Sequence, residues 1–302
     1  MSKVLARIGV PAHAILALAG CGSSNNESSS SSSTPTTSAG GPSANAAIEA
    51  EVPAAIKSKG TLTVASDATY APNEFIAPDG KTVIGMDADL MKALGEVMGL
   101  KVNVVNATFN TIIPGLAAGK YDIGASSFTD TKEREKTVDF VDYFTAGVSF
   151  YAKSSANPTV KGLEDLCGIT VAVEKGTTEQ EEATEQSGKC TKEGKKAVTV
   201  LTYPTQNGAN LAISSGRGEL GMADSPVAAY QVKQSEGAFK LVGETYGAAP
   251  YGLAIPKNSG MTKPILAALK VLISNGTYMS ILTKWGVQAG ALTTPSINGA
   301  QS

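Results

Sequence analysis

The feature that most constrains the fold of this chain is a repeated alternation of short β-rich runs with helical runs. Leu62–Ala65 and Val102–Val105 are separated by apolar residues that recur at helical spacing from Leu90 to Met98. The same order returns later, where β-rich runs are again followed by helical runs, at Ile169–Val173, Val198–Leu201 and Glu219–Ala223. Strands separated by helices pair in parallel through right-handed crossovers, so the pattern predicts an α/β protein with a mainly parallel sheet. Two such units in about 250 residues predict two lobes with a ligand cleft between them.

Local rules predict how several of these helices begin. Asp87 is the expected N-cap of the helix that runs to Met98. Pro114 is tolerable in the next helix only near its first turn, because proline has no N–H to donate. Asp130 or Thr131 is expected to cap a short charged helix that carries Arg134.

Residues 119–144 place polar groups at the end of a buried strand. The loop after Ile123–Ala125 carries hydroxyl side chains and free backbone N–H groups, those of Ser126, Ser127 and Thr129. Loops at the carboxyl ends of strands bind ligands in open α/β sheets, and Arg134 beside such donors would suit a carboxylate. The alternating charges of Lys132–Lys136 are equally typical of a solvated surface. On this stretch alone both interpretations stay open.

The first 47 residues are predicted to be an export signal and a tether. A basic start, an apolar run and small residues up to Gly20 are typical of a secretory signal peptide. A cysteine directly after those small residues resembles the lipobox of bacterial lipoproteins, which implies removal of residues 1–20 and lipidation of Cys21. The alternative is an ordinary signal with a chance cysteine. Residues 21–47 are almost all small or polar and predict a Ser/Thr-rich linker, which leaves 48–302 as the folded domain.

Composition disfavours several classes of function. The single histidine, His13, lies in the predicted signal peptide, so the remaining chain has none for a Ser-His-Asp triad or a His-ligated zinc site. Glycine loops of the Walker or dinucleotide type are missing, and a net charge of −2 gives no reason to expect nucleic acid. No later stretch is long and apolar enough to span a bilayer. We therefore expect no catalytic residues, metal or cofactor, although carboxylate or lysine chemistry stays open.

Two cysteines remain after Cys21, namely Cys167 and Cys190. In an exported chain, two cysteines predict one disulfide, which here would close a loop of roughly 20 residues. The alternative is a pair of free buried thiols.

A series of motifs resembles the family 3 extracellular solute-binding proteins, the amino-acid receptors of ABC importers. In chain order the motifs are DATYAPNEF, GMDADLMKAL, IIPGLAAGKYDIGASSFTDTKERE, VDFVDYF, VAVEKGTTE and ADSPVAAY. The resemblance covers residues 61–290 and implies a two-lobed periplasmic-binding-protein fold of type II, with two hinge strands joining the lobes. It implies hinges near 144–148 and 246–252. Lobe one would then span about 61–145 and 250–290, and lobe two about 146–249.

The same resemblance assigns groups to the two charges of a free amino acid. Arg134 matches the family's carboxylate-binding arginine, and the helix start at Thr177–Thr178 favours the same anion. Asp224 matches the ammonium-binding aspartate, with the Ser127 carbonyl and the Thr129 hydroxyl as further acceptors. Asp224 and Thr178 could instead only cap helices.

Two aromatic residues match positions where the family holds the ligand's side chain. Tyr70 and Phe109 would lie on either side of that side chain, although ordinary core packing is the alternative for both. Asn73 stands where the family commonly has an aromatic residue, which leaves the shape of the slot undefined.

Acidic residues lie near the expected position of the side-chain tip. Asp67 matches a position that often meets a polar tip, and Glu74 and Glu174 are close in sequence to site segments, though Glu174 could be a solvated strand end. Three carboxylates without an obvious cation favour Arg, Lys, Gln or Asn as ligand over Glu or Asp.

The resulting expectation is a monomeric receptor without enzymatic activity. It would capture a polar amino acid, cationic ones included, and deliver it to an ABC permease with its ATPase. A lipid anchor would hold it at the outer face of the cytoplasmic membrane, periplasmic or extracellular. The alternatives are a dehydratase-type enzyme on the same fold, with Glu174 as the candidate catalytic carboxylate, and a sensory receptor without transport.

Overall fold

The computed structural model describes residues 43–301. The predicted signal peptide (1–20), the lipidation site Cys21 and most of the predicted linker lie outside the described residues. Helix α1 (Ala46–Glu51) begins two residues before the expected start of the domain. Asn45 caps it by accepting hydrogen bonds from the N–H groups of Ala47 and Ile48. Ile48 then packs into the hydrophobic core, so the folded part starts near Asn45.

The predicted mainly parallel sheet is confirmed, and eight strands form it in the order β5-β1-β6-β11-β7-β10-β8-β9. Strand β1 (Thr61–Ser66) pairs in parallel with β5 (Lys101–Asn106) and β6 (Ile123–Gly124). Strand β8 (Thr170–Glu174) pairs in parallel with β9 (Thr199–Tyr203) and β10 (Leu220–Asp224). The two parallel groups correspond to the two α/β units that the sequence predicts.

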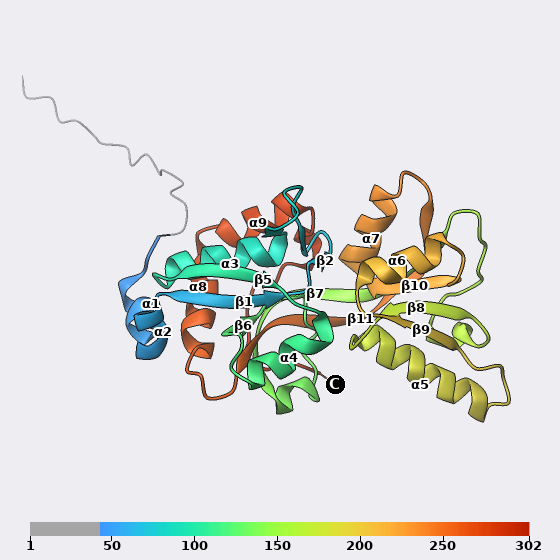
Figure 1. Ribbon diagram of the computed structural model, residues 1–302, viewed down its shortest axis with the longest axis horizontal. Coiled ribbons are helices and arrows are strands. Elements are labelled where there is room, and N and C mark those ends of the chain that lie inside the picture. The colour runs from blue at the N-terminus through green and yellow to red at the C-terminus, as the bar shows by residue number, and fades with distance from the viewer. Residues whose placement is uncertain (1–42, 302) are drawn as a thin grey trace, which may run out of the picture. The chain divides into compact units, whose positions relative to one another are not determined.

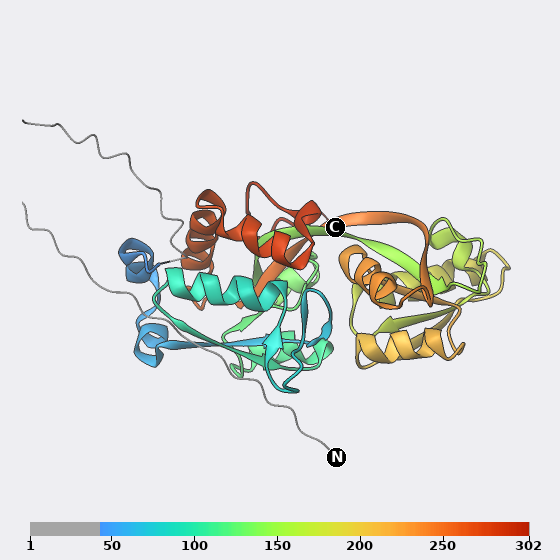
Figure 2. The same cartoon turned by 90° about the horizontal axis from the view of Figure 1, so that it is seen from above.

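Two long antiparallel strands, β7 (Val138–Lys153) and β11 (Phe239–Pro256), join these groups. Figures 1 and 2 show both strands running from one lobe into the other. The register of the pair shifts between Val242 and Tyr246, between Tyr246 and Ala249, and at Gly252. These irregularities overlap the predicted hinge segment 246–252. We use lobe one for residues 46–145 and 251–300, and lobe two for residues 146–250.

In lobe one, helices pack against both faces of the sheet. Alternate residues of β1 point to opposite faces, so Val64 packs against the cluster of α3 (Met86–Val97), α8 (Thr262–Ser274) and α9 (Thr277–Trp285). Ala65 packs against α4 (Phe109–Ala117) on the other face. Helix α2 (Ala54–Lys59) precedes β1. In lobe two, the sheet is covered by α5 (Thr178–Lys192), α6 (Gln206–Ser214) and α7 (Ser225–Gln234), as Figure 1 shows.

Two local predictions for lobe one were wrong, and a third was confirmed in part. Helix α3 begins after Gly85, whose φ of 130° and close approach to the Asn73 carbonyl leave no room for a Cβ, whereas Asp87 lies inside the first turn. Pro114 lies in the second turn of α4 rather than the first. Thr131 accepts a hydrogen bond from the Arg134 N–H, as expected, but the segment is only a three-residue 3-10 turn, Arg134–Lys136.

A small sheet absent from the sequence-based prediction lies beside the larger one. Its strands β2 (Thr69–Tyr70), β3 (Glu74–Ile76) and β4 (Val83–Ile84) are two or three residues long. Such short runs have no periodicity that could reveal them in the sequence.

Cys167 and Cys190 form the predicted disulfide, with their Cα atoms 5.6 Å apart. The bridge ties the turn that follows Leu163–Leu166 to helix α5 inside lobe two. No single helix in residues 43–301 is long and apolar enough to cross a membrane. Helices α8 and α9 reach that threshold only together, and they meet at 79°.

The C-terminal segment 291–301 packs along β7 in lobe one, beyond the predicted end of the lobe at residue 290. Ala291 and Ile297 form bridges to Phe144 and Val141. The Asp142 carboxylate accepts hydrogen bonds from the Ser296 hydroxyl (2.5 Å) and from a backbone N–H. This segment therefore lies against the strand that leads into the hinge.

Candidate ligand-binding site

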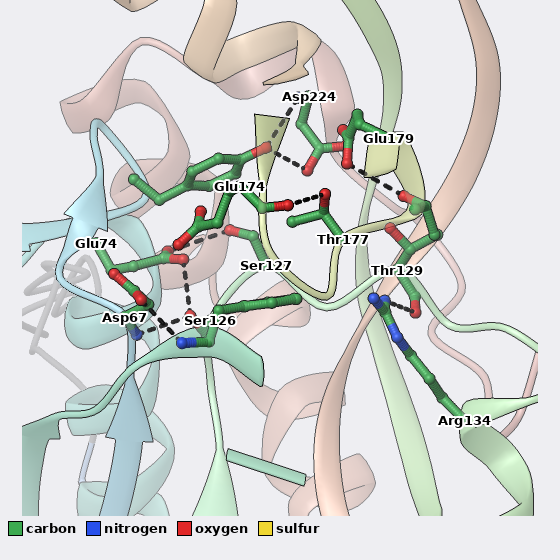
Figure 3. Close-up of a pocket in the computed structure, with 13 residues that line it drawn as sticks. Asp67, Glu74, Ser126, Ser127, Thr129, Arg134, Glu174, Thr177, Glu179 and Asp224 are labelled. Carbon is green, nitrogen blue, oxygen red and sulfur yellow. Dashed lines mark hydrogen bonds between the residues drawn. The ribbon is translucent and has the colours of Figure 1, made fainter. Parts of the chain in front are cut away.

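A pocket between the two lobes contains all ten residues that the sequence predicts for ligand binding. Its empty space, including the opening to solvent, is about 290 Å³. The predicted residues that line it are Asp67, Tyr70, Phe109, Ser126, Ser127, Thr129, Arg134, Thr177, Thr178 and Asp224. Glu74, Glu174 and Glu179 also line it, and Figure 3 shows the arrangement.

The topology explains why residues so distant in sequence meet here. Asp67 follows β1, Ser126 follows β6, and Glu174 and Asp224 end β8 and β10. Within each lobe these strands are parallel, so their carboxyl ends lie at one edge of the sheet. Because β7 and β11 turn the two edges toward each other, four strand ends from two lobes line one pocket.

Arg134 is the one cationic side chain among the residues that line the pocket. Its guanidinium donates to the Thr129 carbonyl (2.8 Å) and, across the cleft, to the Gly176 carbonyl (3.0 Å). It lies over the rings of Phe109 and Phe128, 5.5 and 5.7 Å from their centroids. None of the ion pairs found in residues 43–301 involves it, and burial lowers its pKa. A partly buried guanidinium held only by carbonyls is suited to a ligand carboxylate.

The serine loop in lobe one is bonded to buried acids. The hydroxyls of Ser126 and Ser127 donate to the Glu74 carboxylate (3.2 and 3.1 Å). The Ser127 N–H donates to Asp87 (2.8 Å), which also accepts from the Tyr143 hydroxyl (2.6 Å). The expectation of a free N–H at Ser127 was therefore wrong, because two buried carboxylates take the donors of this loop. Ser127 adopts a left-handed φ of 49°, which is unusual outside glycine.

In lobe two, the start of helix α5 points into the pocket. Thr177 is the N-cap and accepts from the Gln180 N–H (3.3 Å), so Thr178 is the first helical residue and not the cap. The Thr178 hydroxyl donates to Glu179 (3.3 Å). One oxygen of Glu179, Oε1, has no partner among the described residues.

Asp224 occupies the N-cap position of α7, but its carboxylate makes no hydrogen bond to that helix. Instead it accepts from the Tyr70 hydroxyl across the cleft (2.9 Å), and the same hydroxyl accepts from the Asp224 N–H. Capping was the alternative role for this residue, and its side chain does not perform it. The carboxylate is thus directed into the pocket.

The rings have mixed roles. Phe109 stacks on Phe128 with centroids 4.6 Å apart, so one of its faces is packed while the residue still lines the pocket. Tyr70 packs in the hydrophobic cluster of lobe two although it belongs to lobe one. Asn73 does not line the pocket, and its amide donates to the Ser127 hydroxyl (2.9 Å).

The pocket carries a large excess of acidic groups. Five carboxyl groups face a single guanidinium, and they belong to Asp67, Glu74, Glu174, Glu179 and Asp224. Burial raises the pKa of each one. Burial and the neighbouring Asp67 carboxylate raise the pKa of Glu174 to about 10. A site of this kind is electrostatically suited to a ligand with more positive than negative groups.

Glu179 is the pocket residue that the sequence analysis missed. It directly follows the predicted pair Thr177–Thr178 and lies in the first turn of helix α5. Acidic residues are common in first turns for electrostatic reasons, so the position alone carries no ligand signal.

Comparison with known proteins agrees with this geometry. The profile of the bacterial extracellular solute-binding proteins, family 3, matches residues 62–288. The arginine-binding protein ArgT of Corynebacterium glutamicum is 40% identical over 252 residues, which cover 83% of this chain and 82% of ArgT.

Two solved structures of ancestral binding proteins are also similar to this chain. An ancestral arginine-binding protein bound to arginine superimposes with a TM-score of 0.69 at 36% identity, covering 75% of this chain and 98% of that protein. An ancestral amino-acid-binding protein described as a precursor of cyclohexadienyl dehydratase also has a TM-score of 0.69 and 36% identity, with coverage of 76% and 97%.

Proposed function

Because this chain belongs to the bacterial extracellular solute-binding proteins of family 3, we propose that it captures L-arginine between its lobes for an ABC import permease. The observation that carries the choice of ligand is the charge balance of the pocket, in which one unpaired guanidinium faces five carboxyl groups. Arginine has one carboxylate and two cationic groups, which fits this balance. The arginine-binding name of the 40% identical relative supports the same choice.

The ligand's α-carboxylate is assigned to Arg134 and to the N-terminus of helix α5. The guanidinium offers two parallel N–H groups, and the N–H of Thr178 lies at the positive end of the helix dipole. The α-ammonium is assigned to Asp224, with Glu179 as a second anion beside it. A zwitterion needs both charges met, because leaving either one unpaired out of water is costly.

The ligand's side chain is assigned to the opposite end of the pocket. Tyr70 and Phe109 would contact its aliphatic part, and a guanidinium can also lie against a ring face. Asp67 and Glu174 are the acids at the tip. Thr129 and Ser126 complete the wall of lobe one.

Thermal unfolding tests this assignment. The measurement compares the protein, purified with Cys21→Ser and without its signal, alone and with each common amino acid. A ligand at roughly 1,000 times its dissociation constant adds about 4 kcal/mol to the free energy of unfolding, or roughly 8 to 16 °C for a chain of this size. We expect the largest rise with arginine. A rise only with glutamate or aspartate would contradict the cationic assignment, and no rise with any amino acid would contradict the receptor.

The cellular part of the proposal is a lipid-anchored, monomeric receptor at the outer face of the cytoplasmic membrane, served by a permease and its ATPase. The anchor would be Cys21, held to the domain by residues 22–45. Cys21→Ser should release the protein from the membrane fraction. Loss of arginine uptake on deletion of the gene separates a transport receptor from a purely sensory one.

A second candidate is an enzyme of the dehydratase type. It is favoured by Glu174, a buried carboxyl whose raised pKa keeps it protonated, as a general acid requires. We place this candidate second, because the named relative is a binding protein. Incubation with a prephenate-like acid should give no turnover, and measurable turnover would reverse the ranking.

A further inference from the structure

The carboxyl groups of Asp67 and Glu174 meet across the cleft, one from each lobe. Each side chain is only 2% exposed. Both residues line the same pocket, and Figure 3 shows them on the side of it away from Arg134. None of the ion pairs in residues 43–301 places a lysine or arginine between them. Two acids therefore share a buried position without a cation.

The bonding of the two groups is unequal. Asp67 accepts hydrogen bonds from the Thr69 hydroxyl (2.7 Å) and the Phe109 N–H (2.8 Å), both from its own lobe. Glu174 has one oxygen, Oε1, without any partner among the described residues. Fixed donors stabilise the ionised form of Asp67, whereas nothing comparable stabilises a charge on Oε1 of Glu174. Of the two, Glu174 is the group that must accept a proton when the cleft closes without a cation.

We infer that Glu174 is the residue by which this site selects a cationic side chain, because the cleft closes only with a proton on Glu174 or a ligand cation between Glu174 and Asp67. The inference rests on the proposed function and deepens it. A guanidinium presents N–H groups on more than one edge of a rigid plane, so it can bond to both acids at once. With a neutral ligand side chain, no cation lies between the two acids, and Glu174 has to be protonated instead.

Neutral and cationic ligands then differ in their pH dependence. A cationic ligand keeps Glu174 ionised, so its binding takes up no proton near neutral pH. A neutral ligand binds with Glu174 protonated, so its affinity falls as pH rises above the pKa of Glu174 in the open cleft. With one proton linked, the fall is at most about tenfold per pH unit.

All but one of the other groups around Glu174 either oppose its ionisation or stay neutral. Burial raises the pKa of the two tyrosines that face it, so both remain uncharged. A negative charge on Glu179 opposes ionisation of Glu174 further, whereas the nearby Gln206 N–H, which donates to the Thr69 hydroxyl (3.2 Å), lowers the pKa of Glu174. The facing groups are Asp67 and Tyr70 from lobe one, Glu179 from α5, Tyr151 from β7 and Gln206 from α6.

Isothermal titration with L-arginine and L-citrulline tests the inference on the unmodified domain. Citrulline has the shape of arginine but a neutral urea group. From pH 6 to 8.5, the arginine dissociation constant should change by less than about threefold, while that of citrulline should rise by at least about thirtyfold. Titrations in two buffers of different ionisation enthalpy should show uptake of one proton with citrulline and of none with arginine.

Glu174→Gln provides the matching variant, because its amide replaces the protonated carboxyl. Citrulline binding should lose its pH dependence, and arginine should bind at least about tenfold more weakly. The control is Glu185→Gln, which removes the same charge from an exposed position on α5 and should leave both ligands unchanged.

Two results would overturn the inference while leaving the receptor intact. One is citrulline binding with no pH dependence in a protein that binds arginine, and the other is no citrulline binding even at pH 6. Failure of every amino acid to bind would instead contradict the proposed function. If Glu174→Gln does not fold, proton uptake by the unmodified protein decides alone.

Discussion

The two walls of the pocket differ in how completely their polar groups are bonded. In lobe one, the carboxylates of Asp67 and Glu74 each accept two hydrogen bonds from their own lobe. In lobe two, Glu174 and Glu179 each have an oxygen without a partner among the described residues, and the Asp224 side chain accepts only from Tyr70 across the cleft. The wall of lobe one is therefore arranged before a ligand arrives, whereas the wall of lobe two depends on what lies opposite it.

This difference suggests an order of events. A ligand would bind first to the arranged groups of lobe one, and lobe two would close to complete its own bonds. Substitutions in the network of lobe one should then lower the stability of the empty protein. Substitutions among the unsatisfied acids of lobe two should change ligand binding and leave that stability nearly unchanged.

The largest expected effect comes from Arg134, the cation of the lobe-one wall. Arg134→Ala should weaken arginine binding by about 2 to 5 kcal/mol, because the ligand carboxylate would lose its charged partner in a buried site. Isothermal titration measures this loss. Arg217→Ala, at an exposed position in lobe two, is the control and should bind normally. Normal binding by Arg134→Ala would contradict the assignment of the ligand's carboxylate to Arg134 in lobe one.

The disulfide offers a test confined to lobe two. Replacing Cys167 and Cys190 by serine frees a segment of 23 residues and should lower the free energy of unfolding by about 3 kcal/mol. For a chain of this size, the melting temperature should fall by roughly 6 to 12 °C. Arginine affinity at 25 °C should change little, because the bridge lies away from the pocket-lining residues. An unchanged melting temperature would contradict this prediction.

A pair of small substitutions compares the two walls directly. Ser127→Ala removes a donor from the buried Glu74 and should destabilise the empty protein by about 1 to 3 kcal/mol. Glu179→Gln removes a poorly bonded charge and should leave the stability of the empty protein equal or higher. Chemical denaturation measures both values. Equal destabilisation by the two variants would contradict the contrast between the lobes.

The smallest effect concerns the pH dependence of stability without ligand. Burial raises the pKa of Glu182 to about 7, above the ordinary 4.5 that it regains on unfolding. Glu182 therefore loses its proton at a lower pH in the unfolded chain than in the folded protein. The free energy of unfolding falls as pH rises from about 4.5 to about 7. Glu182→Gln should flatten this part of the profile by roughly 1 kcal/mol, discounted because the group is partly exposed.

The control for that profile is Glu185→Gln. Lys189 lowers the pKa of Glu185, so loss of this exposed carboxylate should not flatten the same window. Denaturation curves at pH 5, 6, 7 and 8 compare the variants. An identical slope in the unmodified protein and Glu182→Gln would show that Glu182 titrates normally.

Local order along the chain was largely predictable. Hydrophobic periodicity and the residues that end each element predict the strands β1, β5, β8, β9 and β10 and the helices between them. Both features depend on neighbouring residues. The small sheet and the start of α3 did not follow, and the two hinge strands were expected only from the family resemblance. Gly85 starts α3 because of a close approach to the backbone of Asn73, which no local pattern encodes.

The binding site likewise has features that the sequence predicts and features that it does not. The residue types that gather in the pocket were predictable from motif order, and all ten predicted residues line it. Their bonding was not predictable, since the Ser127 N–H goes to Asp87 and the Asp224 carboxylate goes to Tyr70. These partners are 40 and 154 residues apart, so only the folded chain brings them together.

The sequence alone determined the alternation of strands and helices, the single disulfide and the kinds of charge available for a ligand. Those properties reside in neighbouring residues and in composition. The tertiary structure alone decided which charges are already bonded and which remain unsatisfied. Hydrogen bonding and burial depend on contacts between distant segments, and at this pocket those contacts cross from one lobe to the other. Asp67 and Glu174 line the same pocket from opposite lobes, and only the tertiary structure brings them to it.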